Sequence, residues 1–418
     1  MAYFQATLGI IAFIGIAVAL SEKRRLPSWR LIAGGLGLQF LFAWLVFRFE
    51  FVQAALRGIN QLVQAITTSV ETGTAFVFGY LGGGPGNVAY PFELSDANAT
   101  VILAFRILPL ILFVTAFSAV LWHLRILPAL VRAFSYVLRR SLGVGGAVGL
   151  SAAANVFMGM VESPALIRPC LRSLTRSELF IVMTCGMATV AGSVLVLYSV
   201  VLQEVLDNAL GHVLTASVIS APAAIMLAAI MVPETGSSSA DDVELRSSYQ
   251  SMMDAVTKGT GDGLRLMLNV GAMLIVLIAL VALINSLLAL LPQVGGQDIS
   301  LQGLFGWLFA PLVWLMGIPW SEAPLAGSLM GTKTVLNELL AYFALAELPA
   351  GTLGERSTVI LTYALCGFAN FGSLGIMIAG LSGMCPERGG EIVELAMPAL
   401  VSGTLATCMT GAVAGLLV

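Results

Sequence analysis

The sequence predicts an all-α integral membrane protein with eight transmembrane helices, two opposed re-entrant hairpins, an inverted repeat and interfacial helices. Of its 418 residues, 58% are apolar and only 10% are charged, whereas a soluble domain carries about 25% charged residues. Lipid tolerates the surface that such a chain must expose. The 44 glycines suit helices that approach closely within a membrane. The net charge of −3 gives no basic surface for nucleic acid.

Apolar runs long enough to cross a bilayer identify the spanning helices. The sequence has eight of them, at about residues 5–20, 31–47, 100–122, 179–205, 213–232, 266–291, 357–381 and 392–418. Lys and Arg gather in alternate connections and are therefore expected on the cytoplasmic side: Lys23, Arg24, Arg25, Arg30, Arg125, Arg132, Arg139, Arg140, Arg172, Arg176, Arg246, Lys258, Arg265 and Arg388. This bias predicts that both termini lie outside the cytoplasm.

Two segments are too polar for plain spans and too apolar for free loops. Residues 144–171 and 318–348 are interrupted by Gly and Pro, and each contains a glutamate. We interpret both as re-entrant helical hairpins, because irregular backbone at membrane depth must be buried in protein or line a cavity. Residues 51–75 have apolar side chains at helical spacing. They predict either a helix in the membrane interface or one packed on the bundle.

An internal repeat relates the two hairpins. In both copies a hairpin with a glutamate precedes an Arg-Ser pair, which precedes a helix containing Cys-Gly-x-Ala. The matching residues are Met158, Gly159, Glu162, Arg176, Ser177 and Cys185 in one copy, and Met330, Gly331, Glu338, Arg356, Ser357 and Cys366 in the other. The two spans between the copies make the repeat inverted, which in secondary transporters puts a binding site at the bilayer midplane.

The repeat divides the chain into four parts. Residues 1–99 are expected to form peripheral scaffold helices with the interfacial helix, and residues 100–232 the first inverted repeat. Residues 233–265, rich in Ser and Asp, are expected to form a cytoplasmic polar loop. Residues 266–418 then contain the sixth helix and the second repeat.

Glu162 and Glu338 lie in apolar surroundings, where an ionised carboxylate costs about 2.5–3.5 kcal/mol or more. Such groups are retained when they bind a ligand or pair with a cation. Arg168 and Lys333 are close enough in sequence to neutralise them, so a structural ion pair is one alternative. Asn155 and Asn370 add neutral polar groups. The set suits an uncharged, hydroxyl-rich solute better than an anion, which would need several Arg.

Three motifs then resemble the concentrative nucleoside transporter family, over about residues 75–418. The Cys366–Phe371 stretch is similar to the family's seventh-helix signature, and Gly331–Lys333 with Asn337 and Glu338 to its second hairpin. Asn155–Pro164 resembles the first hairpin. The resemblance implies a homotrimer in a plasma membrane, expected to be a bacterial inner membrane. It also implies import of nucleosides by cotransport with sodium, with no other cofactor and no enzymatic activity.

The resemblance also implies roles for individual residues. Ribose would contact Glu338, Asn370 and Ser373, with Phe368 beside them, and the nucleobase would face Gly159, Met160, Val161 and Glu162. Sodium would be held by the side chains of Asn155 and Thr189 and the carbonyls of Met158 and Val190. Met160 and Val161 depart from the family, which has glutamine and a hydroxyl residue there. The base preference is therefore open.

Three alternatives remain, one within transport and two from other classes. One is a proton-coupled carrier of modified nucleosides, nucleobases or another neutral hydroxylated solute. Another is an intramembrane enzyme that uses the paired glutamates as acid and base. The sequence has only two histidines and no HExxH motif, which disfavours the enzyme. A channel needs a continuous pore, which two opposed hairpins around a central site would interrupt.

Overall fold

The computed structural model describes residues 2–23, 28–83, 102–203, 205–234, 236, 249–293 and 298–418, and every regular element in these ranges is a helix. The all-α prediction is therefore confirmed for this part of the chain. The cations Arg24, Arg25 and Arg246 and most of the polar loop between 233 and 249 lie outside the described residues. So does the expected domain boundary at residues 99 and 100.

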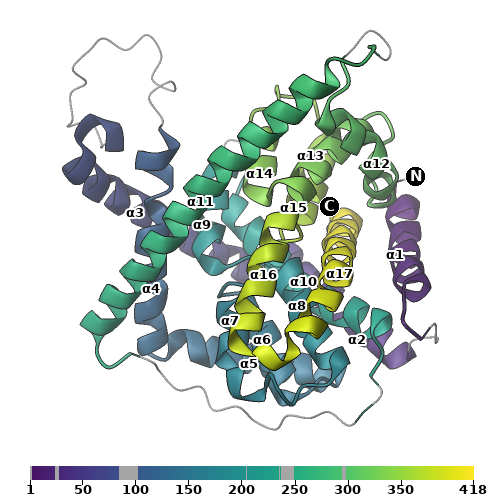
Figure 1. Ribbon diagram of the computed structural model, residues 1–418, viewed down its shortest axis with the longest axis horizontal. Helices are drawn as coiled ribbons and strands as arrows, with labels where there is room; N and C mark the ends of the chain where they lie inside the picture. The colour runs from purple at the N-terminus through teal and green to yellow at the C-terminus, as the bar shows by residue number, and fades with distance from the viewer. Residues whose placement is uncertain are drawn as a thin grey trace.

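Seventeen α-helices and four short helices make up the described chain (Figure 1). The α-helices are α1 (Ala2–Ala19), α2 (Trp29–Arg48), α3 (Glu50–Phe78), α4 (Leu110–His123), α5 (Ile126–Leu142), α6 (Gly146–Asn155), α7 (Glu162–Leu166), α8 (Arg176–Ala188), α9 (Gly192–Leu202), α10 (Ala209–Met231), α11 (Met252–Leu288), α12 (Leu301–Leu315), α13 (Ala323–Val335), α14 (Glu338–Ala346), α15 (Glu355–Leu365), α16 (Phe371–Met384) and α17 (Gly389–Leu417). The short helices are η1 (Gly79–Gly82), η3 (Leu103–Ile107), η4 (Arg168–Cys170) and η5 (Pro386–Arg388).

Within the described ranges, six helical stretches are long and apolar enough to cross a membrane. They coincide with six of the eight expected spans: Trp29–Arg48, Leu103–His123, Arg176–Leu202, Ala209–Met231, Met252–Leu288 and Pro386–Leu417. The first expected span is the shorter apolar helix α1, and the seventh is divided into α15 and α16. The small and polar residues in the Cys-Gly-x-Ala helices predict interruptions. The structure confirms them at residues 189–191 and 366–370.

Both segments interpreted as hairpins consist of helices joined by a short irregular turn. Residues 144–171 contain α6 and α7, and residues 318–348 contain α13 and α14. Figure 1 shows α6 and α7 in the lower part of the molecule and α13 and α14 in the upper part. The two helix pairs therefore lie at opposite ends of the molecule in this view.

Two helical segments differ from the sequence interpretation. Residues 126–142, treated as a loop containing cations, form α5, which buries Val131, Ser135 and Leu138 on one face. Its arginines interrupt the apolar run, so the segment does not stand out by average hydropathy. Residues 252–265, assigned to the polar loop, are the first turns of α11. This helix begins there because the Ser251 hydroxyl accepts a hydrogen bond from the Asp254 amide.

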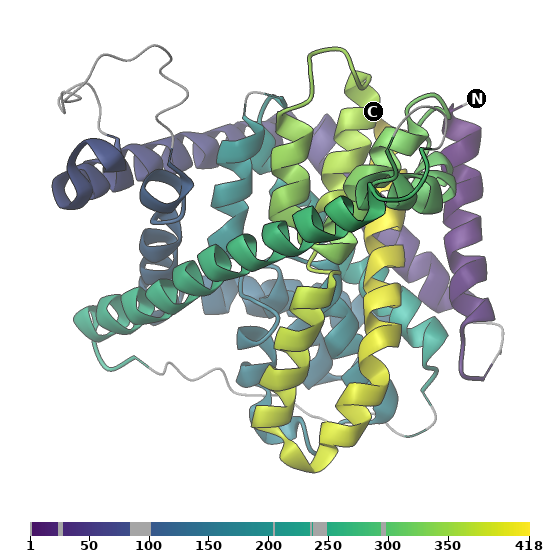
Figure 2. The same ribbon diagram turned by 45° about the horizontal axis from the view of Figure 1, so that its top comes forward.

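The long helix α3 buries one stripe of apolar residues at helical spacing, which includes Leu56, Val63, Ile66 and Val70. Part of this stripe packs with α4, α9 and α10 in a small apolar cluster. α3 is therefore a helix packed on the bundle along one face. Figure 2 shows that it lies across the direction of the neighbouring vertical helices.

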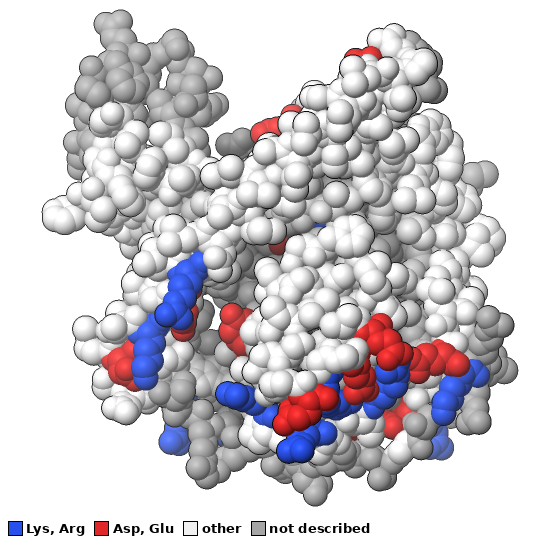
Figure 3. Space-filling view, viewed as in Figure 1, with Lys and Arg blue, Asp and Glu red and all other residues white. Residues whose placement is uncertain are grey.

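Charge and apolar surface are separated on the face seen in Figure 3, where Lys, Arg, Asp and Glu concentrate in a lower band. The described part of that end contains three ion pairs: Arg172 with Glu387, Arg176 with Glu394 and Arg388 with Glu391. Both termini lie at the opposite end (Figure 2). Between the two ends, α11 crosses the face with much of its apolar surface exposed.

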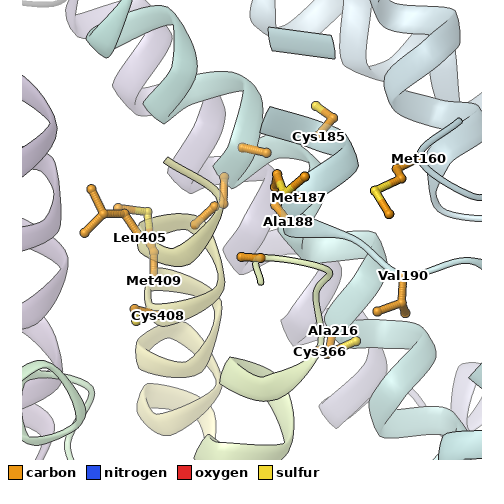
Figure 4. Packing of buried hydrophobic residues seen from close by; sticks show 14 of the residues in the cluster. Met160, Cys185, Met187, Ala188, Val190, Ala216, Cys366, Leu405, Cys408 and Met409 are labelled. Atoms are coloured by element: carbon orange, nitrogen blue, oxygen red, sulfur yellow. The ribbon is translucent and has the colours of Figure 1, made fainter. Parts of the chain in front are cut away.

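The buried centre is formed by the two interrupted helices together with α10 and α17. Figure 4 shows Met187 and Ala188 of α8 between Cys185 and the α17 residues Leu405 and Cys408, and Cys366 beside Ala216 of α10. All five cysteines are free, and four of them are buried. They act here as small packing residues, as the absence of CxxC spacing predicts.

Candidate functional site

The two helix interruptions meet at the centre of the molecule. The Phe368 amide donates a hydrogen bond to the Thr189 carbonyl at 3.3 Å, which joins the second interruption to the first. The Gly192 amide, at the start of α9, donates to the Phe157 carbonyl in the turn of the first hairpin at 3.2 Å. Buried backbone amides and carbonyls outside a helix need other hydrogen-bond partners. Here the second interruption bonds to the first, and the residue after the first interruption bonds to the turn of the first hairpin.

Gly367 is required for this close approach. A Cβ atom at this position would lie 2.6 Å from Thr407 Cγ2 and 2.8 Å from the Ala188 carbonyl oxygen. Real side-chain carbons do not reach such distances, so any larger residue forces α8, α15 or α17 to move.

We expect Gly367→Val to destabilise the folded protein, since overpacking a close contact costs about 1–3 kcal/mol. The melting temperature of the protein in detergent measures the effect. It is determined from the loss of the monodisperse size-exclusion peak after heating. Gly375→Ala in α16 is the matched control, because a Cβ there meets no atom within 4 Å. Equal melting temperatures for Gly367→Val and wild type would contradict the close approach.

Glu338 is the centre of a buried hydrogen-bonded group. Its Oε1 accepts from the Tyr198 hydroxyl at 2.5 Å, and its Oε2 accepts from Asn370 Nδ2 at 2.9 Å. Glu338 is 5% exposed and Asn370 is 2% exposed. The Tyr198 ring lies 5.1 Å from that of Tyr342, centre to centre. Three helices, α9, α14 and α16, therefore hold one carboxylate in a fixed orientation.

Two helix N-termini meet at this carboxylate. Glu338 is in the first turn of α14, and Asn370 is the N-cap of α16, where its Oδ1 accepts from the Ser373 amide at 2.7 Å. The positive end of a helix dipole stabilises nearby negative charge. The arrangement offsets part of the cost of burying the Glu338 carboxylate. It also leaves acceptor positions that a ligand hydroxyl can use, because a carboxylate has about four lone-pair sites.

The structure thus brings together most of the residues expected to bind ribose. Glu338, Asn370 and Ser373 are buried in one hydrogen-bonded group. Phe368 is partly exposed, and its carbonyl accepts from the Asn370 amide at 2.8 Å. It therefore lies at the edge of the same group.

The residues expected to face the nucleobase are more dispersed. Met160 is 8% exposed and lies against α8, where a Cβ at Gly186 would be 3.1 Å from its Cβ. Val161 lies against α16, since a Cβ at Gly380 would be 2.8 Å from its Cγ2. Glu162 is exposed, and its carboxylate lies beside Gly159. Among the described residues, no hydrogen bond joins Glu162 to the Glu338 group.

Two of the residues expected to bind sodium, Asn155 and Thr189, lie at neighbouring helix C-termini. Asn155 is the last residue of α6, and Thr189 follows the end of α8. The Thr189 Oγ1 lies 3.5 Å from the Asn155 carbonyl oxygen and 2.9 Å from that of Cys185. Val190 is fully buried, and Met158 is partly exposed in the hairpin turn. Amide, hydroxyl and carbonyl oxygens at such ends suit a hard monovalent cation.

Neither glutamate forms a direct ion pair with its candidate cation among the described residues. Lys333 donates to the Ala364 carbonyl at 2.8 Å and to Thr407 Oγ1 at 2.9 Å, and the partners of Glu338 are Tyr198 and Asn370. Arg168 is exposed in η4. The described residues include no Arg168–Glu162 ion pair.

Sequence reasoning missed three groups that contact this region: Tyr198, Ser217 and Thr407. Tyr198 lies in a continuous apolar run, where its single hydroxyl was the available signal. Ser217 of α10 is 3.5 Å from the Val190 amide, and Thr407 of α17 binds Lys333. α10 is the last helix of the first repeat and α17 is the last helix of the second. This correspondence could have identified the two hydroxyls as equivalent polar groups.

Comparisons with known proteins agree with this geometry. Residues 212–415 match the family profile described as "Na+ dependent nucleoside transporter C-terminus", and residues 8–81 match the corresponding N-terminus. Residues 104–204 match a profile described as "Nucleoside recognition". The nucleoside permease NupC of Helicobacter pylori is 33% identical over 99% of this chain and 97% of its own. The chain belongs to the concentrative nucleoside transporter family.

Other similar proteins match nearly the whole chain. The uncharacterized transporter YutK of Bacillus subtilis is 35% identical over 98% of both chains. Sodium/nucleoside cotransporter 1 of Sus scrofa is 33% identical over 98% of this chain, which spans 63% of that longer protein. The solved structure of CNTnw in an inward-facing substrate-bound state superposes with a TM-score of 0.89, at 35% identity over 100% of this chain and 98% of that one.

Membership of the concentrative nucleoside transporter family establishes the class of function. The protein is a membrane transporter and not an enzyme, and it imports nucleosides with sodium as the coupling ion. Similar structures exist in inward-facing, outward-facing and intermediate states, which implies alternating access. The predicted function and the predicted coupling ion are therefore confirmed at the level of the family.

Proposed function

We propose that the nucleoside binds between the two hairpins near the middle of the bilayer, with its ribose hydroxyls on Glu338 and Asn370. The observation that carries this proposal is the buried carboxylate of Glu338, which Tyr198 and Asn370 orient without neutralising it. Ser373 and Phe368 complete the ribose side. Gly159, Met160, Val161 and Glu162 form the base side, which reaches the ribose side when the protein closes around its substrate.

Sodium binds, in this proposal, to the side chains of Asn155 and Thr189 and to the carbonyls of Met158 and Val190. The C-termini of α6 and α8 support this assignment, because Thr189 Oγ1 lies 3.5 Å from the Asn155 carbonyl oxygen and a helix C-terminus attracts positive charge. The bound ion would order the turn of the first hairpin next to the substrate. Sodium and nucleoside would then each increase the affinity of the other.

The finer architecture belongs to the same proposal. Eight spans are counted when α1 and the α15–α16 pair are included, and α6–α7 and α13–α14 are re-entrant. Residues 1–99 serve as scaffold, and 100–232 and 266–418 contain the two repeats. The band of charge opposite the termini supports a cytoplasmic lower end, with both termini outside. The family resemblance supports a homotrimer in a bacterial inner membrane.

Uptake into proteoliposomes tests the function directly. With a panel of labelled nucleosides, we expect saturable and concentrative uptake that requires an inward sodium gradient. A potassium gradient of equal size is the control for membrane potential and osmotic effects. Uptake that follows a proton gradient and ignores sodium would support the proton-coupled alternative.

Base selectivity is expected to be weak, or to favour purines. The side chains of Met160 and Val161 lack strong hydrogen-bonding groups, and an unpaired polar edge of a base costs about 1–3 kcal/mol. A thioether against an aromatic face contributes about 0.3–1.5 kcal/mol, which a larger purine ring exploits better.

The double substitution Met160→Gln with Val161→Thr should shift preference towards uridine, as measured by competition between uridine and adenosine. Val161→Thr alone is a near-isosteric control for the contact with Gly380. A wild type that strongly prefers uridine, and keeps that preference in the double variant, would show that these side chains do not face the base.

A further inference from the structure

Lys333 is a buried cation that the transport mechanism does not yet use. It is fully buried, and its ammonium group donates to the Ala364 carbonyl at 2.8 Å and to Thr407 Oγ1 at 2.9 Å. A charged side chain at membrane depth costs at least about 2.5–3.5 kcal/mol. A group kept at such a cost has a specific partner, and here that partner is the end of a helix.

The ammonium group lies where two helices of the second half end. Lys333 is in the last turn of α13, which ends at Val335, and Ala364 is in the last turn of α15, which ends at Leu365. Carbonyls in a last turn lack partners within their own helix, and a helix C-terminus attracts positive charge. The lysine therefore neutralises the junction between the turn of the second hairpin and the interruption after α15.

The first half has the same junction without a lysine. There α6 ends at Asn155 and α8 ends at Ala188, and the Thr189 hydroxyl lies 3.5 Å from the Asn155 carbonyl oxygen. This is the proposed sodium site. Each junction is thus formed by the first helix of a hairpin and the helix before an interruption.

Helices α10 and α17 extend the correspondence. α10 has hydroxyls at Ser217 and Ser220, and α17 has them at Thr407 and Thr410, with the same spacing. Ser217 lies 3.5 Å from the Val190 amide at the first junction, and Thr407 binds the lysine at the second. Ser220 and Thr410 contact each other at 3.0 Å, between the two halves.

We propose that the Lys333 ammonium group occupies, in the second half, the position that sodium occupies in the first. It is a covalently attached cation that fastens the turn of the second hairpin to the end of α15. This inference rests on the proposed sodium site in the first half. Because a covalently attached cation cannot dissociate, only the first hairpin responds to sodium, and Lys333 is a positioning residue for Glu338.

Hydrogen–deuterium exchange of the full-length protein in nanodiscs, without nucleoside, tests this assignment. The two turns, residues 156–161 and 334–337, are compared in sodium and in potassium. For the wild type we expect sodium to slow exchange only at 156–161, by about tenfold when its concentration is about ten times its Kd. Sodium protection of 334–337 in the wild type would overturn the proposal.

Substitution of Lys333 then tests whether the second junction can bind sodium once the ammonium group is removed. In Lys333→Asn, an amide oxygen replaces the ammonium group, and we expect exchange at 334–337 to become faster in potassium and to be slowed by sodium. Lys333→Arg is the matched control, because it keeps a permanent cation and should leave 334–337 indifferent to sodium. A Lys333→Asn protein whose second turn exchanges like that of the wild type in both salts contradicts the proposal.

Two further outcomes distinguish a folding defect in the variant from an error in the proposed sodium site. If Lys333→Asn is not recovered as a folded protein, Thr407→Val replaces it, since it removes one acceptor and keeps the side-chain shape. Exchange at 334–337 should then rise several-fold, with the sodium response at 156–161 unchanged, and no rise overturns the proposal. A wild type in which sodium fails to protect 156–161 refutes the sodium site itself, whatever happens at the second turn.

Discussion

Replacing Glu338 with glutamine should weaken nucleoside binding by about ten- to a hundredfold. The carboxylate is already oriented by Tyr198 and Asn370, and a hydrogen bond to a charged group contributes about 1.5–3 kcal/mol. Glutamine keeps the size of the side chain and can still accept a hydrogen bond from Asn370. The loss of affinity therefore measures the contribution of the negative charge. Isothermal titration of the purified protein with nucleoside in saturating sodium measures the effect.

Two comparisons make this result specific. Tyr198→Phe removes one orienting hydrogen bond and keeps the charge, so its effect should be smaller, at about 0.5–1.5 kcal/mol. Nucleosides without ribose hydroxyls should bind the wild type weakly, and Glu338→Gln should scarcely weaken them further. Wild-type affinity in Glu338→Gln would remove Glu338 from the ribose site.

Asn155→Ala should abolish the stimulation of nucleoside binding by sodium. Asn155 is 2% exposed at the end of α6, and alanine has no side-chain oxygen to offer the ion. In the wild type, sodium should raise nucleoside affinity and nucleoside should raise sodium affinity by the same factor, because coupling free energy is reciprocal. Titration of nucleoside at several sodium concentrations, with choline as replacement, measures the factor.

Ser151→Ala provides a control one turn earlier in the same helix. Ser151 contacts Ser163 within the first hairpin at 2.9 Å and belongs to no proposed ligand set. Its substitution weakens the hairpin and should leave the dependence on sodium in place. If Asn155→Ala keeps the full sodium response, the ion binds elsewhere.

Local composition was sufficient to predict the framework of this protein. Gly, Ser, Thr and Asn after Cys185 and Cys366 predict the two interruptions, and long apolar runs predict the spans. Helix α5 was missed because its arginines share a helix with its buried residues, and average hydropathy does not distinguish faces. The start of α11 depends on one capping serine at residue 251, which a window of hydropathy cannot register.

The candidate site was predictable only in part. Glu338 and Asn370 could be associated through the family motifs, but their link to Tyr198 depends on the position of α9. The partner of Lys333 could not be predicted, because a backbone carbonyl such as that of Ala364 has no sequence signal. Side-chain types indicate which groups need partners, whereas tertiary packing decides which partners they obtain.

The hydrogen bond between the Phe368 amide and the Thr189 carbonyl has a consequence for biosynthesis. A ribosome delivers the first interruption to the membrane long before it delivers the second. Until then the Thr189 carbonyl lacks its Phe368 partner, and an unsatisfied backbone group in hydrocarbon costs several kcal/mol. The nascent first half must therefore keep its centre hydrated or shielded by other protein. The contact between the two interruptions can form only after Phe368 has entered the membrane.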